Sequence, residues 1–123
     1  MKYGVVIQAR MSSSRLPGKV LMDIEGKPML LRQVERLSNK IKNFPIIVAT
    51  SKDASDDEVE ELCKENDINI FRGSLDNVMF RFIECGKFYN LDFIVRVGGD
   101  DPLVDPDCCL KLISDHQIEN NDF

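Results

Sequence analysis

The sequence lacks the residue spacing that builds zinc sites. It contains four cysteines and one histidine, and no two cysteines form a C-x-x-C pair. Structural zinc is usually held by cysteines and histidines at such short spacings, so a zinc site is not expected. Neighbouring Cys108 and Cys109 on one helix would point about 100° apart, which suits packing better than chelation. We therefore expect the thiols to be reduced and to belong to the core.

Long apolar runs and an excess of positive charge are also missing. No segment approaches the roughly 20 apolar residues of a membrane-spanning helix. The first residues, MKYGVVIQAR, contain too short an apolar run for a signal peptide. The formal net charge is -5, whereas proteins that bind duplex nucleic acid usually have a basic face. These absences predict a cytoplasmic protein without a membrane or nucleic-acid partner.

The residues that are present suit one globular α/β domain over 1–123. Hydrophobic residues make up 43% of the chain and charged residues 30%, which is enough apolar material for one core. Continuous apolar runs predict strands at 3–8, 46–49, 69–71 and 93–97. A polar loop is expected over 9–26, between the first strand and the first helix.

Four helices are expected between and after these strands. Pro28 begins the first, whose apolar stripe is Leu30, Val34, Leu37 and Ile41. A capping box, Ser55-Asp56-Asp57-Glu58, opens the second helix, which ends near Asn66. Ser74 caps the third helix, whose inward positions are Val78, Phe82, Cys85 and Tyr89. Asp105-Pro106 opens the fourth helix, which runs through Cys109, Leu112 and Ile113, with His116 as a surface residue near its end.

The alternation of strands and helices predicts how the chain folds. Such an order gives right-handed crossovers and a mostly parallel sheet covered by helices on both faces, a three-layer α/β/α Rossmann-like architecture. Ligands of such sheets bind beyond the carboxyl ends of the strands. The residues that follow the first and fourth strands are therefore candidates for a binding site.

The loop QARMSSSRLPGK, residues 8–19, follows the first strand directly. Its cations Arg10, Arg15 and Lys19 and the hydroxyls of Ser12, Ser13 and Ser14 can donate to phosphate oxygens. Neither the Walker A pattern nor G-x-G-x-x-G is present. From residue types alone, the loop is either a phosphate-binding loop or a solvated polar loop with a turn at Pro17-Gly18.

The fourth strand leads into Gly98-Gly99-Asp100-Asp101-Pro102. In a parallel sheet this segment would lie at the same edge as the cationic loop. A carboxylate there can hold Mg²⁺, and Mg²⁺ can bridge phosphate oxygens. Cations after the first strand and carboxylates after the fourth, at one edge of the sheet, favour a polyphosphate ligand with a divalent cation.

Several segments resemble one known family. They are V-I-Q-A-R-M-S-S-S-R-L-P-G-K-V-L at the start, Ile47–Ser51, Phe71–Val78 with Arg81-Phe82, and Arg96–Leu103. Together they resemble the N-terminal half of the cytidylyltransferases that act on sugar acids. That family includes the 3-deoxy-manno-octulosonate and acylneuraminate enzymes and the spore coat polysaccharide biosynthesis protein F group. The resemblance implies the nucleotide-diphospho-sugar transferase type of three-layer fold.

The resemblance also implies an activity and a site. The family transfers CMP from CTP to a sugar acid, with Mg²⁺, and releases pyrophosphate in surface polysaccharide biosynthesis. Residues implied at the nucleotide are Ala9, Arg10, Ser14, Arg15, Lys19, Arg72 and Ser74, of which Arg10, Arg15 and Lys19 would grip the triphosphate. Asp100 would be the first metal ligand, with Asp101 in support. Members are often dimers, which implies a homodimer.

Alternatives remain open at the level of single residues and of the whole chain. Arg15 could instead pair with an acid at the surface, Arg72 could flank a turn, and Asp100 could be a turn residue. The octulosonate enzymes have Gln-Gly-Asp-Glu-Pro where this chain has Gly98–Pro102. The family takes a second metal-binding aspartate and the acceptor pocket from its later half. We expect this chain to be the N-terminal part of a longer cytidylyltransferase; the alternative is a naturally short relative that binds nucleotide without catalysis. Two other functions compete, a non-catalytic nucleotide or nucleotide-sugar binding module and a glycosyltransferase of the same fold.

Overall fold

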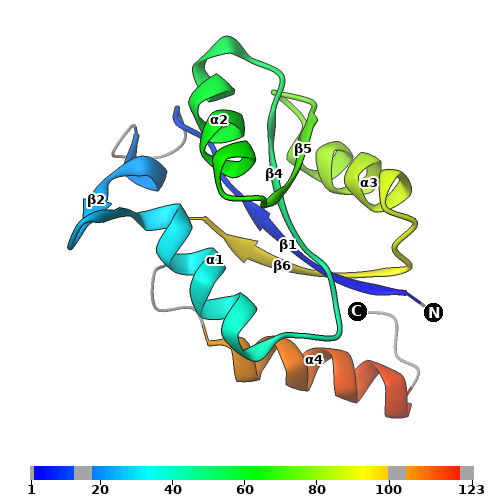
Figure 1. Ribbon diagram of the computed structural model, residues 1–123. Helices are drawn as coiled ribbons and strands as arrows, with labels where there is room; N and C mark the ends of the chain where they lie inside the picture. Colours follow the sequence, from blue (N-terminus) through cyan, green and yellow to red (C-terminus); the bar gives the residue numbers. More distant parts are fainter. Residues whose placement is uncertain (1, 13–17, 100–104, 120–123) are drawn as a thin grey trace.

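A parallel sheet of four strands forms the centre of the computed structural model, which describes residues 2–12, 18–99 and 105–119. The strands lie in the spatial order β5-β4-β1-β6 (Figure 1). Their bounds are β1 Tyr3–Gln8, β4 Ile46–Ser51, β5 Asn69–Gly73 and β6 Phe93–Gly98. Each neighbouring pair is parallel, which confirms the predicted sheet.

Helices cover both faces of this sheet (Figure 1). Their bounds are α1 Met29–Lys40, α2 Asp57–Glu65, α3 Val78–Phe88 and α4 Pro106–Glu119. Side chains of α1, α2 and α4 share one core cluster with the β1 residues Val5 and Ile7. Residues of α3 form a second cluster with the β1 residue Val6 on the opposite face. The three-layer α/β/α architecture is therefore confirmed, because successive strand residues point to opposite faces.

Short elements join β1 to α1. They are a 3-10 turn, η1 at Lys19–Leu21, and an antiparallel pair, β2 at Asp23–Ile24 with β3 at Lys27–Pro28. Pro28 is the last residue before α1 rather than its first helical residue. The predicted apolar stripe of α1 is buried at all four positions.

The strand ends differ from their predicted bounds because backbone pairing continues past the apolar runs. Thr50 pairs with Arg72, and Ser51 pairs with Gly73, which lengthens β4 and β5 by polar and glycine residues. Polar side chains at these positions gave no apolar signal. Each of these two strands is therefore two residues longer than predicted.

Both predicted serine caps are wrong. Ser55 lies inside a 3-10 turn, η2 at Ala54–Asp56, where its backbone N donates to Asp53 Oδ2 at 3.0 Å. Ser74 Oγ accepts a hydrogen bond from Asn77 N at 3.2 Å, in the turn before α3. The N-cap of α3 is Asn77, whose side chain accepts from Phe80 N at 2.9 Å. In contrast, Asp105 caps α4 as predicted, by accepting from Asp107 N at 2.9 Å.

The environment of α4 corrects two further expectations, on His116 and on Cys108. His116 is buried, not at the surface, and its Nδ1 lies 2.9 Å from the hydroxyl of Tyr3 in a hydrogen bond. Its ring also packs on Phe93, with ring centroids 4.3 Å apart. Leu112 is exposed, and so is Cys108, although the other three cysteines are buried and all four thiols are free. Within the described ranges, no helix has the length and apolar character needed to cross a membrane.

Candidate functional site

The strand order reverses at β1, between β4 and β6. The chain passes from β1 to its neighbour β4, continues outward to β5, and then returns to β6 on the other side of β1. Open α/β sheets bind ligands at the carboxyl ends of the strands where the order reverses in this way. Gln8 pairs with both Ala49 and Gly98, so β1, β4 and β6 end at the same edge. The topology therefore places the candidate site at this edge.

Close contact between the ends of β1 and β6 explains one of the glycines at this edge. Gly99 N donates to Gln8 O at 2.6 Å. A Cβ on Gly99 would collide with that carbonyl oxygen and lie 3.1 Å from the Cα of Ala9. From the α1 side, the buried Gln33 donates from Nε2 to Gly98 O at 2.5 Å. The segment that leads to Asp100 thus starts directly beside the segment that leads to Arg10.

Arg10 links three loops at this edge. Its Nε lies 3.4 Å from Asp56 Oδ2, and its Nη2 donates to Ser12 Oγ at 2.5 Å. Its Nη1 reaches Leu75 O at 3.5 Å, which is long for a hydrogen bond. The Arg10 side chain keeps 17% of its surface exposed. Arg10, which the sequence predicts to bind phosphate, therefore lies at the edge of the sheet, partly held by protein contacts and partly open to solvent.

Two buried ionic residues complete this cluster and were not predicted as site residues. Asp56 has no exposed surface and accepts from Met11 N at 2.8 Å and from Ser51 Oγ. Arg81 is also fully buried, and it donates from Nε to Ser74 O at 2.9 Å and from Nη2 to Leu75 O at 3.2 Å. Burial lowers the pKa of Arg81, and the nearby charge of Arg10 lowers it further.

A sequence signal could have found Arg81 but not Asp56. Positions 78, 81, 82 and 85 follow the i, i+3, i+4, i+7 spacing of an inward helix face, so Arg81 falls on the buried stripe of α3. The residues around Asp56 have the pattern of a helix start. This pattern gives no indication that the Asp56 side chain points into the protein. Its partners Arg10 and Met11 are far away in sequence and meet it only through the pairing of β1 with β4.

Other predicted site residues that the structure describes lie at the same edge of the sheet. Ala9 is buried, and its N donates to Ala49 O at 3.0 Å. Gly18 N donates to Met11 O at 2.6 Å, so Lys19, the next residue, comes back to the end of β1. Ser74 follows β5 and accepts from Arg81 through its backbone oxygen. The predicted residues Ser14, Arg15 and Asp100 lie outside the described residues.

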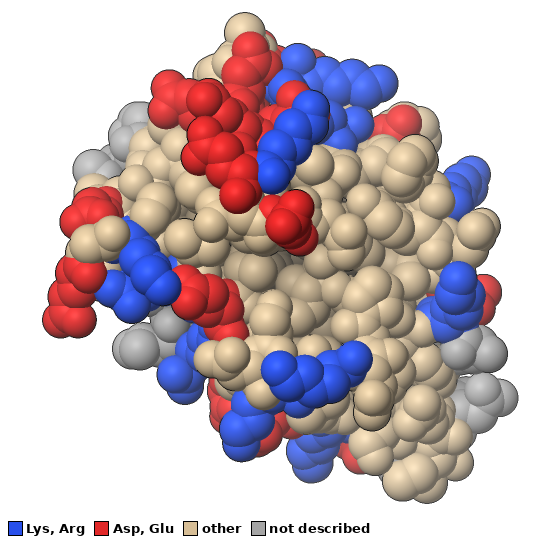
Figure 2. Space-filling view, in the orientation of Figure 1, with Lys and Arg blue, Asp and Glu red and all other residues tan. Residues whose placement is uncertain are grey.

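Arg72 is held by several protein partners. It donates from Nε to Ser51 O and from Nη2 to Asp53 O, both at 2.7 Å, and its Nη1 lies 2.8 Å from Asp57 Oδ1. Burial lowers the pKa of Arg72, but Asp57 and Glu60 outweigh this effect and raise it. These contacts join the end of β4 to β5 and to α2, whose acidic surface is the red group at the top of Figure 2. A contact between Arg72 and a nucleotide stays a prediction.

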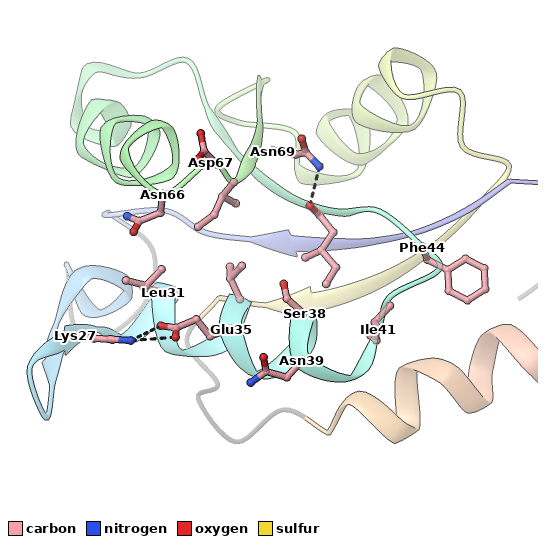
Figure 3. A pocket seen from close by; sticks show the side chains of 13 residues that line it. Lys27, Leu31, Glu35, Ser38, Asn39, Ile41, Phe44, Asn66, Asp67 and Asn69 are labelled. Atoms are coloured by element: carbon pink, nitrogen blue, oxygen red, sulfur yellow. Dashed lines mark hydrogen bonds and ion pairs between the residues drawn. The ribbon is translucent and has the colours of Figure 1, made fainter.

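Two hollows differ in their relation to this edge. One, of about 310 Å³, is lined by Gln8, Gly98 and Arg96, and the Arg96 guanidinium lies 4.4 Å from the centre of the Phe82 ring. A larger hollow of about 560 Å³ lies between α1 and the first residues of β4 and β5 (Figure 3). That larger hollow is at the amino ends of the strands, away from Arg10.

Among residues 2–12, 18–99 and 105–119, no three acidic, histidine or cysteine side chains gather as a metal site.

Comparison with known proteins identifies the family. Residues 4–123 match the family described as cytidylyltransferase. The chain belongs to the cytidylyltransferase family. It is 34% identical over 122 residues to the spore coat polysaccharide biosynthesis protein SpsF of Bacillus subtilis, covering 96% of this chain and 51% of that protein. The predicted family resemblance is thus confirmed, and the chain spans about half the length of the curated relatives it matches.

Solved cytidylyltransferase structures share the fold. A cytidylyltransferase from Leptospira borgpetersenii serovar Hardjo-bovis superposes with a TM-score of 0.87 at 39% identity, covering 98% of this chain and 50% of that one. CMP:2-keto-3-deoxy-manno-octonic acid synthetase, solved with CTP, gives a TM-score of 0.84 at 29% identity, covering 98% and 49%. The predicted nucleotidyltransferase type of fold is therefore confirmed.

Proposed function

We propose that this chain binds CTP and forms the nucleotide-binding domain of an Mg²⁺-dependent cytidylyltransferase. The enzyme would transfer CMP from CTP to a sugar acid and release pyrophosphate, in surface polysaccharide biosynthesis. One observation supports this most directly: the Arg10 cluster lies at the strand edge of a chain that superposes over 98% of its length on a protein solved with CTP. A cytoplasmic location and a homodimer also remain predictions.

The residues at the edge suit a triphosphate. Arg10, Arg15 and Lys19 would supply positive charge, with hydroxyl donation from Ser14, in the manner of other phosphate sites. The long contact from Arg10 Nη1 to Leu75 O is weak enough for a phosphate oxygen to replace it. The buried backbone of Ala9 would form a wall for the nucleoside, near Ser74 and Arg72.

The proposed reaction is a substitution at phosphorus. An oxygen of the sugar acid forms a bond to the α-phosphorus of CTP, and the bond to the leaving pyrophosphate breaks. Bound Mg²⁺ offsets charge on the phosphates. Asp100 would hold that ion, and the described contact between Gly99 and Gln8 anchors the residue just before it. Arg10 and Lys19 would stabilise the negative charge that builds on the leaving group.

A non-catalytic nucleotide-binding module is the second candidate. In its favour, the cluster around Arg10 would hold the phosphates of a nucleotide whether or not transfer follows. In that case nucleotide binding would occur here without transfer. A glycosyltransferase of this fold is less well supported, because the family match is to nucleotidyl transfer.

Calorimetric titration of the chain with CTP, ATP, GTP and UTP, each with and without Mg²⁺, tests the proposal. We expect selective binding of CTP that requires Mg²⁺ and is about tenfold weaker in Lys19→Ala and Asp100→Ala. Lys111→Ala is the matched control, because Lys111 is on α4 and 77% exposed. Equal affinities in wild type, Lys19→Ala and Asp100→Ala would refute the site.

Pyrophosphate release then separates the two candidate functions. Sugar acids would be supplied with CTP and Mg²⁺ to this chain and, in parallel, to a longer polypeptide of the length of its relatives. Release by either one supports the transferase. If CTP binds but neither polypeptide releases pyrophosphate, the result would support the module instead.

A further inference from the structure

Asp56 has an unusual environment for a carboxylate at the start of a helix. Within the described ranges it is the only acidic side chain that is fully buried. A buried charge is costly unless hydrogen bonds and an opposite charge compensate it. Its partners are Arg10, Met11 and Ser51, all of which lie at or just after the ends of β1 and β4. The compensation for this charge thus comes entirely from the edge where the candidate site lies.

We infer that Asp56 is a positioning residue that sets the direction of Arg10 and fixes the base of the loop after it, for the binding of the CTP triphosphate. The inference rests on the proposed function. Asp56 would not touch the nucleotide itself, because its side chain is fully covered by protein. It would act through Arg10 and through the Met11 backbone.

The two carboxylate oxygens have separate tasks. Oδ2 accepts from Ser51 Oγ and faces Arg10 Nε at 3.4 Å, which leaves the two Nη groups of Arg10 directed elsewhere. Oδ1 accepts from Met11 N at 2.8 Å. Met11 O in turn accepts from Gly18 N at 2.6 Å, so both ends of the segment between Met11 and Gly18 are tied to Asp56 through one residue. One carboxylate therefore holds both the guanidinium and the base of the loop.

The position of Asp56 is itself fixed by the protein. Ser51 Oγ, which donates to Asp56, also accepts from Asp53 N at 3.2 Å, and Asp56 N donates to Asp53 O at 3.0 Å. Asp56 is also the residue immediately before α2, where the partial positive charge of the helix end favours a carboxylate. A rigid anchor of this kind limits the freedom of Arg10, so less entropy is lost when an anion binds.

The local charge balance fits an anionic ligand. Two buried or partly buried guanidinium groups, on Arg10 and Arg81, lie near the carboxylate of Asp56, and both approach Leu75 O. Within the part of the chain that the structure describes, the buried Arg81 Nη1 has no hydrogen-bond partner. The positive charges of Arg10 and Arg81 thus lie close together at this edge, where a phosphate group can offset them at short range.

A double-mutant cycle tests whether Asp56 acts through Arg10. CTP affinity would be measured with Mg²⁺ for wild type, Asp56→Asn, Arg10→Ala and the double variant. We expect Asp56→Asn to weaken CTP binding about tenfold in the wild-type background, and less than about threefold when Arg10 is already absent. A purely structural role would give the same fold-change in both backgrounds, which would overturn the inference.

Amide hydrogen exchange tests the positioning without any nucleotide. In the wild type, the amides of Met11 and Gly18 are expected to exchange slowly. In Asp56→Asn or the milder Ser51→Ala, both should exchange at least about tenfold faster, with core amides such as that of Val48 unchanged as a check of folding. Asp92→Asn is the matched control, because Asp92 accepts from Lys2 N at 2.8 Å at the opposite end of the sheet.

The outcomes separate this inference from the proposed function. If wild type binds no nucleotide, the proposed function fails, and the exchange data still decide whether Asp56 anchors the loop. Faster exchange at Met11 and Gly18 would support the anchor, and unchanged exchange would overturn it. If CTP binds to wild type and to Asp56→Asn with equal affinity, the proposed function stands and the role of Asp56 is refuted.

Discussion

Replacing Gly99 by alanine perturbs the point where β1 and β6 meet. Its new Cβ would collide with the carbonyl oxygen of Gln8, and it would lie 3.1 Å from both the Cα and the Cβ of Ala9. These neighbours belong to the chain backbone or are attached directly to it, so no flexible side-chain end can move aside. Relief requires the two strand ends to separate, which weakens the 2.6 Å hydrogen bond from Gly99 N to Gln8 O.

The expected cost of Gly99→Ala follows from these contacts. Overpacking in a well-packed region costs about 1–3 kcal/mol, to which a weakened backbone hydrogen bond adds about 1 kcal/mol. We therefore expect the free energy of unfolding to fall by about 2–4 kcal/mol. For a chain of this size the melting temperature should fall by roughly 4 °C per kcal/mol. Under the proposed function, CTP affinity should fall as well, because Ala9 and Arg10 come directly after the displaced Gln8.

Urea and thermal denaturation of wild type, Gly99→Ala and Gly86→Ala measure this effect. Gly86 is the matched control because it lies inside α3, and a Cβ there would meet only the end of the Ile94 side chain at 3.1 Å and Leu91 O at 3.8 Å. Alanine in a helix interior is favoured over glycine by about 0.5–1 kcal/mol, so Gly86→Ala should be neutral or stabilising. Equal midpoints for Gly99→Ala and wild type would refute the argument that the strand ends are in tight contact.

Two further predictions concern buried groups away from the site. Tyr3→Phe leaves His116 Nδ1 without its hydroxyl partner and should lower the free energy of unfolding, measured in urea, by about 1–3 kcal/mol. The control Tyr89→Phe removes only a long 3.4 Å hydrogen bond and should lower it less, so equal losses in the two variants would contradict the prediction. A thiol-reactive disulfide at pH 8 should label exposed Cys108 in the folded protein and Cys63 only after unfolding, because burial raises the pKa of Cys63 to about 12. The folded state keeps that proton more tightly than the unfolded chain, so the Cys63 contribution to stability is complete below about pH 8.5 and is lost as the pH rises toward 12. Rapid labelling of Cys63 in the folded protein would contradict the prediction.

Much of the architecture could be predicted from local patterns. Apolar runs located all four strands of the main sheet, and helical spacing located α1 with its buried stripe from Leu30 to Ile41. These signals are strong because burial on two faces, or on one helix face, leaves a periodic pattern in the sequence. Element ends were predicted less well, since the pairing of Thr50 with Arg72 leaves no such pattern.

The sequence by itself determined the alternation of strands and helices, the family, and the cationic loop that begins at Arg10. Only the tertiary structure decided which residues meet there. Asp56 and Arg81 are buried beside Arg10 because the pairing of β1, β4 and β5 brings distant loops together. His116 is buried because α4 packs against the first residues of β6 and β1, Phe93 and Tyr3. Local residue types cannot reveal such neighbours, because the same aspartate or histidine is stable in water on an isolated helix and becomes a buried partner only when the strands are in place.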